Sequence, residues 1–293
     1  MNPTQGFIAK TSGMAVVLGL LAASPAMADP FHFSTGSVTD SIATASRPGP
    51  TSGANQETES ADDFFPSTAV RLNSATFTGL IPTGASVSEV VVEIYRVFPK
   101  DSDMMRMPNV PTRMNSPSDV EFDSRNSGVA GGLSFTTTSL SSSFTALASI
   151  DTNVTLNAGS AGSVTEPEVR FNVTFDVPID LPADHYFFVP QVLLTDPNEH
   201  FLWLSASRPI DGTGTPFTPD LQSWMRNAQL DPDWLRIGTD IIGGVMFNAA
   251  FSLDGVTVPE PASLSLLGMA LAGMGVFGWR RSRRTQPCAG TST

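Results

Sequence analysis

The middle of the chain alternates apolar and polar residues with the period of a β-strand. Between Glu168 and Val177 every second residue is apolar and the residues between them are polar, which predicts a strand with one buried face. Val87 to Phe98 is apolar on both sides, which indicates a strand at the centre of a sheet. Further runs of this kind are Ala69 to Leu80, Tyr186 to Leu194, Phe201 to Ala206 and Val245 to Leu253.

Turn residues separate these runs, and no helical segments alternate with them. Pro178, Pro182 and Gly212 are examples, and such residues end strands and form turns. Successive strands without intervening helices favour an architecture of packed sheets. The predicted fold is therefore all-β, an antiparallel β-sandwich or jelly roll. The polar segments that we expect to be loops are Ser46 to Asp62, Asp101 to Asp119 and Asp151 to Glu166.

One short helix is expected near residue 220. Thr218 suits the N-cap, Pro219 suits the first helical position, and Asp220 favours the positive end of the helix dipole. The apolar residues that such a helix would place on one face are Leu221, Trp224, Met225 and Ala228.

The N-terminal residues 1–28 have the pattern of a secretory signal peptide. Lys10 precedes an apolar stretch from Met14 to Ala23. Ala26 and Ala28 supply the small residues that signal peptidase requires at positions −3 and −1 of a cut before Asp29. A buried core helix is the alternative, but polar, loop-like sequence follows directly. We therefore expect the mature chain to begin at Asp29.

A second apolar segment lies close to the C-terminus, from Leu264 to Trp279. As a helix its 16 residues would rise about 24 Å, against a hydrocarbon core of roughly 30 Å, and Trp279 at the interface would extend its reach. The basic residues that follow it are Arg280, Arg281, Arg283 and Arg284. The positive-inside rule keeps such a cluster in the cytoplasm. The pattern predicts a single transmembrane helix, and a buried terminal helix is the alternative.

The residues just before this segment are expected to be extended. Pro259 and Pro261 have no amide donor, and each pushes the residue before it toward an extended conformation. A stretched, unpaired tetrapeptide beside a membrane suits the cleft of an enzyme, and Glu260 gives it one charged group. An ordinary proline-rich linker is the alternative.

Val258-Pro259-Glu260-Pro261, the apolar segment and the arginine cluster together resemble the PEP-CTERM sorting signal of Gram-negative bacteria. The resemblance implies recognition by an exosortase, a membrane enzyme that cuts near the motif and moves the protein outward. Pro259, Glu260 and Pro261 would then be bound, not catalytic. It also implies association with exopolysaccharide or biofilm matrix. The expected division of the chain is a signal peptide at 1–28, an all-β ectodomain at 29–257, the sorting signal at 258–284 and a cytoplasmic tail at 285–293.

The ectodomain is acidic and has no cysteine. The whole chain has a net charge of −12, and the ectodomain is more acidic because Lys10 and the arginine cluster lie outside it. Such a charge repels nucleic acid and anionic lipid, so no nucleic-acid partner is expected. The single cysteine, Cys288, lies beyond the predicted membrane span. The ectodomain therefore lacks a disulfide framework and thiolate metal ligands.

No catalytic signature is apparent in the ectodomain. Its histidines lack metalloprotease spacing, and it has neither a nucleophile elbow nor a phosphate-binding loop. Carboxylates are its richest chemical resource. In an extended segment Asp119, Glu121 and Asp123 would share one face, and calcium takes six to eight oxygen ligands. A calcium site there is one hypothesis, and solvated acidic side chains are the alternative.

Three tryptophans, Trp203, Trp224 and Trp234, lie in one short span of the chain. Exposed aromatic faces stack on sugars, so these residues are candidates for a ligand-binding site. Trp203 alternates with leucines and Trp224 lies on the apolar side of the expected helix, so core packing is the alternative.

Three functions follow as hypotheses. The first is an exported, non-enzymatic structural protein of the cell surface or of an exopolysaccharide or biofilm matrix, sorted by an exosortase. Its precursor would be anchored in the inner membrane, and the processed protein would lie at the cell surface or outside the cell. The second is a carbohydrate-binding module that uses the tryptophans. The third is a secreted hydrolase acting on matrix polysaccharide.

Overall fold

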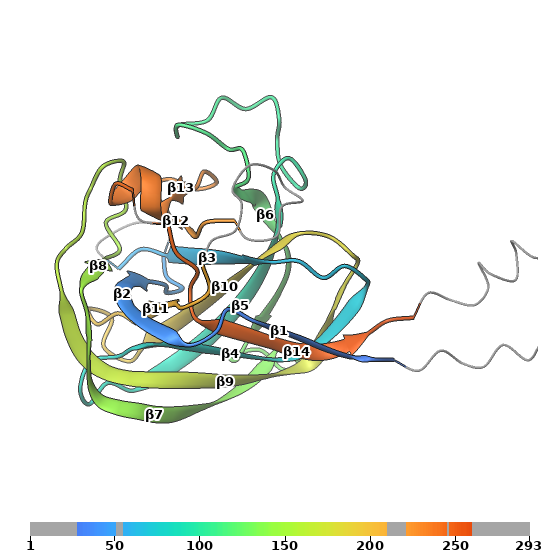
Figure 1. Cartoon of the computed structure of the whole chain (residues 1–293), viewed down its shortest axis with the longest axis horizontal. Coiled ribbons are helices and arrows are strands. Elements are labelled where there is room, and N and C mark those ends of the chain that lie inside the picture. Colours follow the sequence, from blue (N-terminus) through green and yellow to red (C-terminus); the bar gives the residue numbers. More distant parts are fainter. Residues whose placement is uncertain (1–27, 51–54, 210–220, 245, 260–293) are drawn as a thin grey trace, which may run out of the picture. The chain divides into compact units, whose positions relative to one another are not determined.

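The computed structural model describes residues 28–50, 55–209, 221–244 and 246–259, and the body that they form, Ala28–Pro259, is almost entirely β-structure (Figure 1). The described elements are β1 (Pro30–Ser34), β2 (Val38–Ala45), β3 (Thr58–Phe64), β4 (Val70–Leu80), β5 (Val87–Val97), β6 (Pro117–Asn126), β7 (Leu133–Ala146), β8 (Ala148–Ile150), β9 (Val164–Leu181), β10 (Tyr186–Leu194), β11 (Leu202–Ala206), β12 (Trp224–Asn227), β13 (Leu235–Arg236), the π-helical turn η1 (Ile237–Ile241) and β14 (Phe251–Thr257).

The strands form two sheets. The larger sheet has eight strands with β4 at its centre: β9 and then β7 extend it on one side, and β14–β1 and β11–β2–β8 share the other side. The smaller sheet has six strands in the order β13-β12-β3-β10-β5-β6. Every described pairing of named strands is antiparallel except the pairing of β2 with β8. The predicted antiparallel all-β fold is thereby confirmed.

The two sheets pack face to face through one aromatic core. Phe77 of the larger sheet stacks on Phe171 at 4.8 Å between ring centroids, and Phe188 of the smaller sheet stacks on Phe251 of the larger at 5.0 Å. All four rings belong to one buried cluster, which draws residues from both sheets. Apolar burial of this kind, about 25 cal/mol per Å², is the main stabilising term available to a domain without disulfides.

The strand with alternating residues and the strand that is apolar on both sides are found where they were expected. Glu168 to Val177 lies within β9, and Val87 to Phe98 covers β5. Gly79 of β4 permits the close approach of β11, since a Cβ at this position would lie 2.2 Å from the Phe201 ring. The prediction of a loop from Ser46 to Asp62 is wrong at its end, because β3 begins at Thr58.

The predicted short helix around residue 220 is wrong where the structure describes it. Trp224–Asn227 form β12, in which Trp224 pairs with Ala61 of β3. All four residues of β12 are buried, so both sides of the segment are covered. The helical spacing of its apolar residues therefore does not distinguish a helix from a strand. Pairing with β3 then decides the backbone conformation, because buried amide groups need partners. Thr218 and Asp220 lie outside the described residues.

Both predicted terminal segments fall mainly outside the described residues. Of the predicted signal peptide, the structure describes only Ala28. The predicted transmembrane helix and arginine cluster lie within 260–293, which the structure does not describe. Within the described ranges, no helix has the length and apolar character to cross a membrane.

Candidate functional site

The two ends of the β domain lie side by side in the larger sheet. β1 pairs antiparallel with β14, with Pro30 opposite Val256 (Figure 1). The Thr257 amide donates to the Asp29 carbonyl at 2.8 Å, and the Asp29 amide donates to the Thr257 hydroxyl at 2.9 Å. The residue after the predicted signal-peptide cut is therefore bonded directly to the last residue of β14.

Regular pairing stops where the predicted sorting motif begins. The last described backbone hydrogen bond after β14 is donated by the Val258 amide to the Ala69 carbonyl at 2.8 Å. Pro259, the next residue, has no amide hydrogen with which to continue a ladder. The β domain thus runs up to the motif without an intervening linker. The rest of the motif, Glu260 and Pro261, and the arginines of the predicted membrane stop lie outside the described residues.

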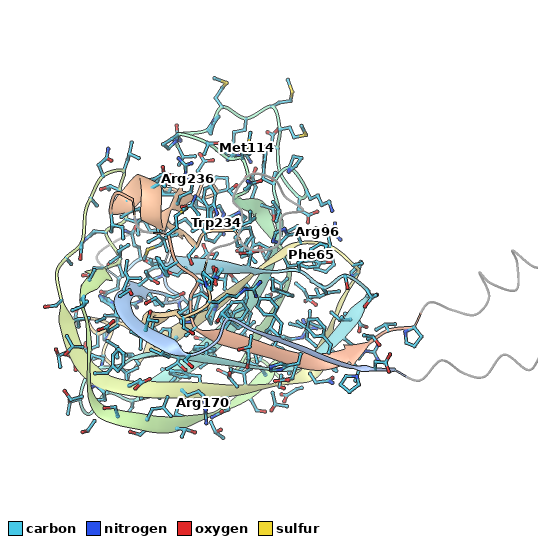
Figure 2. The ribbon with its side chains drawn as sticks, viewed as in Figure 1. Phe65, Arg96, Met114, Arg170, Trp234 and Arg236 are labelled. Carbon is cyan, nitrogen blue, oxygen red and sulfur yellow. The ribbon has the colours of Figure 1, made fainter. Side chains whose placement is uncertain are left out.

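The three candidate tryptophans do not form a binding surface. Trp203, Trp224 and Trp234 have exposed fractions of 0, 1 and 1 %. Trp203 lies in the core between the sheets, and its indole donates to the Ala250 carbonyl at 2.9 Å. Figure 2 shows Trp234 within the body of the domain, whereas Met114 lies at its surface. A sugar stacks only on an exposed ring face, so these rings offer no platform for one.

The three candidate calcium ligands are engaged separately. Asp119 accepts hydrogen bonds from Arg113 and Arg106, Asp123 accepts one from Arg125 at 2.5 Å, and Glu121 is exposed. The pairing of β6 with β5 is irregular between Glu121 and Asp123, so the strand does not present an even row of carboxylates. Among the residues that the structure describes, no three His, Cys, Asp or Glu side chains are grouped so as to hold a metal ion.

The histidines also have separate partners. His185 Nε2 lies 2.5 Å from Asp63 Oδ2, and both side chains are buried. His32 Nδ1 lies 2.7 Å from Asp254 Oδ1 on the exposed β1–β14 pair. These contacts hold strands and loops in place, and they do not bring the histidines together.

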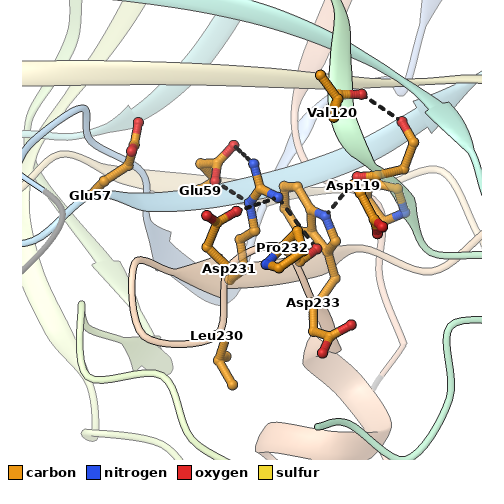
Figure 3. Close-up of polar contacts among 12 residues, drawn as sticks. Glu57, Glu59, Asp119, Val120, Leu230, Asp231, Pro232 and Asp233 are labelled. Atoms are coloured by element: carbon orange, nitrogen blue, oxygen red, sulfur yellow. Dashed lines mark hydrogen bonds and ion pairs between the residues drawn. The ribbon is translucent and has the colours of Figure 1, made fainter. Parts of the chain in front are cut away.

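Sequence reasoning missed a buried polar cluster on the outer face of the smaller sheet, the face turned away from the aromatic core (Figure 3). Arg226 of β12 lies opposite Glu59 of β3, and its Nη2 donates to Glu59 Oε1 at 3.0 Å and to the Tyr95 hydroxyl at 2.8 Å. The guanidinium also lies 4.3 Å from the Trp234 ring centroid. Burial lowers the pKa of Arg226, but attraction to Glu59 and Tyr95 outweighs it and keeps the pKa raised. We call Glu59, Glu93, Tyr95 and Arg226 the outer-face cluster.

Within this cluster, Tyr95 lies between two carboxyl groups. Its hydroxyl oxygen is 2.9 Å from Glu59 Oε1 and 3.1 Å from Glu93 Oε2. A tyrosine hydroxyl carries one proton and cannot donate to both. Burial and repulsion from Glu59 raise the pKa of Glu93 well above its usual range. Glu93 therefore keeps a proton at pH values where an ordinary glutamate has lost it.

A second set of bonds joins the loop between β5 and β6 to the segment just before β13. Arg106 donates to Asp233 through Nη1 at 2.8 Å and Nη2 at 2.6 Å, and the Asn109 amide adds a bond of 2.9 Å. Burial would raise the pKa of Asp233, but these bonds outweigh burial and lower it. The neighbouring Trp234 indole donates to the Ser118 carbonyl at 3.2 Å. These contacts join the β5–β6 loop and β6 to Asp233 and Trp234, which are far away in the sequence.

The outer-face cluster is suited to holding the fold together. Its carboxyl groups are bonded to Arg226 and Tyr95. A nearby cavity of about 360 Å³ is lined by other residues, namely Phe98, Pro99, Met104, Arg106, Pro108, Arg113, Met114 and Asn115. Sequence alone held one weak signal for the cluster, the alternation of Glu57 and Glu59 with a residue between them. Its partners come from β5 and β12, whose pairing the alternation does not reveal.

Comparison with known proteins confirms the sorting motif. A family model described as the PEP-CTERM protein-sorting motif matches residues 257–284. The match begins at Thr257, the last residue of β14. No curated protein and no solved structure shows significant similarity to the chain.

Proposed function

We propose that this chain is a non-enzymatic structural protein whose β domain is displayed at the cell surface or in an extracellular matrix. The PEP-CTERM motif at 257–284 implies an exported protein, made as a membrane-anchored precursor and processed by an exosortase. The proposal adds to this the role of the β domain after sorting.

The observation that carries the proposal is the position of the motif relative to the fold. β14 ends at Thr257, and the last described backbone hydrogen bond after it joins the Val258 amide to the Ala69 carbonyl. A cut at the motif would therefore release or transfer the β domain with its pairing complete. A cut before Asp29 would likewise leave β1 intact, since β1 begins at Pro30. The domain is built so that both ends can be processed without loss of structure.

The internal chemistry of the domain supports a structural role. The carboxylates of the outer-face cluster and the His185–Asp63 pair are bonded within the protein. The candidate tryptophans are buried, so they lend no support to a carbohydrate-binding module. Association with an exopolysaccharide or biofilm matrix is a prediction that follows from the sorting signal alone.

The test is to produce the full chain in a bacterium that carries an exosortase and to determine both termini of the exported protein by mass spectrometry. We expect an N-terminus at Asp29 and loss of the arginine cluster. A variant with Pro259→Ala, Glu260→Ala and Pro261→Ala should keep its C-terminus and stay in the membrane fraction, because the exosortase would no longer recognise it.

The matched control is Glu121→Ala, which removes one exposed glutamate outside the motif and should be sorted like the wild type. Sorting of the triple variant at the wild-type level would refute the role of the motif. Hydrolysis of matrix polysaccharide by the purified exported protein would refute the structural role.

A further inference from the structure

Among the described strands, β1, β6, β7, β8 and β13 lie at the edges of the two sheets. An edge strand presents unpaired amide and carbonyl groups to other chains, and proteins protect such edges with short strands, proline or charge. β1 has five residues and begins with Pro30, β8 has three residues and β13 has two. β6 has ten residues, but it begins with Pro117 and carries charges, among them Asp119 and Asp123. Four edges are therefore protected.

β7 is the exception. Its 14 residues, LSFTTTSLSSSFTA, include no charged residue and no proline. Among the described strands it pairs only with β9, and Figure 1 shows it as the outermost strand of the larger sheet. From Leu133 to Ser139 the pairing with β9 is in continuous register, and irregularities begin only beyond Ser139.

The middle of β7 is open to solvent as well as at its edge. Residues 136–140 are all exposed, whereas Leu133 and Phe135 at the start of the strand pack against the aromatic core. In an antiparallel pair every second residue directs its amide and carbonyl groups away from the partner strand. Thr136, Thr137 and Thr138 are β-branched and favour the extended conformation. The segment is thus a neutral template for another strand.

We propose that Leu133–Ser139 is an assembly edge, on which a second copy of this chain adds the same segment of its own β7 in antiparallel orientation. A neutral strand can pair with its own copy without repulsion, whereas self-pairing of β6 would bring its carboxylates together. Opposed threonine and serine side chains stabilise such a pair. In a chain with a net charge of −12, this strand is also a place where two copies can approach without facing acidic side chains.

Such pairing would join copies of the proposed structural protein to one another. The inference rests on the proposed function only for the place where the copies would meet. It can be measured in the full chain before any processing. A failure of sorting and a failure of self-assembly are therefore separate results.

The test is cysteine cross-linking in the full chain purified in detergent, with the native Cys288 changed to serine. Single cysteines are placed at Ser134, Thr136, Thr137 and Thr138, and the control is Thr174→Cys on β9, which is exposed but one strand inside the edge. After mild oxidation we expect a disulfide-linked dimer that peaks at one scanned position, because antiparallel self-pairing brings only the residue nearest the two-fold axis against its own copy. Equal dimer yields at all positions, or none above Thr174→Cys, would overturn the proposal.

A charge on the edge supplies the second arm. Adding Thr137→Lys to the Thr136→Cys variant should abolish its cross-link, because two lysines would then lie close together across the pair. Thr174→Lys, the same change one strand inside, should leave the cross-link at its original yield. Thermal unfolding checks that both lysine variants keep the fold. If the two variants cross-link equally well, β7 is not the contact.

Discussion

The two faces of the smaller sheet are stabilised by different kinds of interaction. On the inner face, Ile94, Phe188 and Val192 pack into the aromatic core against the larger sheet. On the outer face, the side chains of Tyr95 and Arg226 also join buried carboxyl groups, beside a second apolar cluster that includes Trp234. Apolar packing is non-directional and tolerates small changes. A buried charge depends on one specific partner, so the outer face should be the more sensitive of the two to a single substitution.

The largest effect is expected when the only cation of the outer-face cluster is removed. Arg226→Met keeps much of the side-chain volume but leaves Glu59 buried without its positively charged partner, which should lower the free energy of unfolding by about 3–5 kcal/mol. The measurement is urea denaturation. The matched control, Arg71→Met, breaks an exposed pair with Asp180 and should leave stability unchanged. Equal stability of the Arg226→Met variant and wild type would mean that the cluster contributes no net stabilisation.

Smaller losses of stability are expected for substitutions of two adjacent residues of β5 that point to opposite faces. Tyr95→Phe removes the hydroxyl that bonds Glu59, Glu93 and Arg226, at a cost of about 1–3 kcal/mol. Ile94→Val removes one methylene from the inner face, at a cost of about 0.5–1.5 kcal/mol. Both are measured by denaturant unfolding. A greater loss for Ile94→Val than for Tyr95→Phe would contradict the proposed contrast between the faces.

The smallest effect is one of pH, and only the outer face should show it. Because the pKa of Glu93 is raised in the folded protein, its contribution to stability is complete below the ordinary glutamate pKa of about 4.3. That contribution is lost as the pH rises through the raised folded value. Glu93→Gln, which cannot ionise, should therefore flatten the fall of the melting temperature toward alkaline pH.

Glu121→Gln is the control for this experiment, since Glu121 is exposed and its replacement should leave the pH profile as in wild type. Melting temperatures of all three proteins across the pH range give the answer. An unaltered slope in the Glu93→Gln protein would show that Glu93 carries no retained proton.

Strands of the two sheets also differ in how far the sequence predicts them. The alternation in Glu168 to Val177 identified β9 of the larger sheet, because one face of that strand is buried and the other exposed. β3 was hidden, since its polar residues, including Glu59 and Asp62, suggest a loop although all seven residues are buried. Their partners, Arg226 and Ser223, are more than 150 residues away in the chain. No local pattern contains that information.

The sequence by itself determined the all-β character of the domain and the sorting motif at its C-terminal end. Strand periodicity, the lack of an amide hydrogen in proline and clustered charge are all local properties. Only the tertiary structure decided that Trp224 lies in a strand, that the tryptophans are buried, and that Asp29 is bonded to Thr257. These outcomes depend on which strands pair. Strand pairing satisfies backbone groups and buries side chains across long sequence separations, and so it can override the local preference of a short segment.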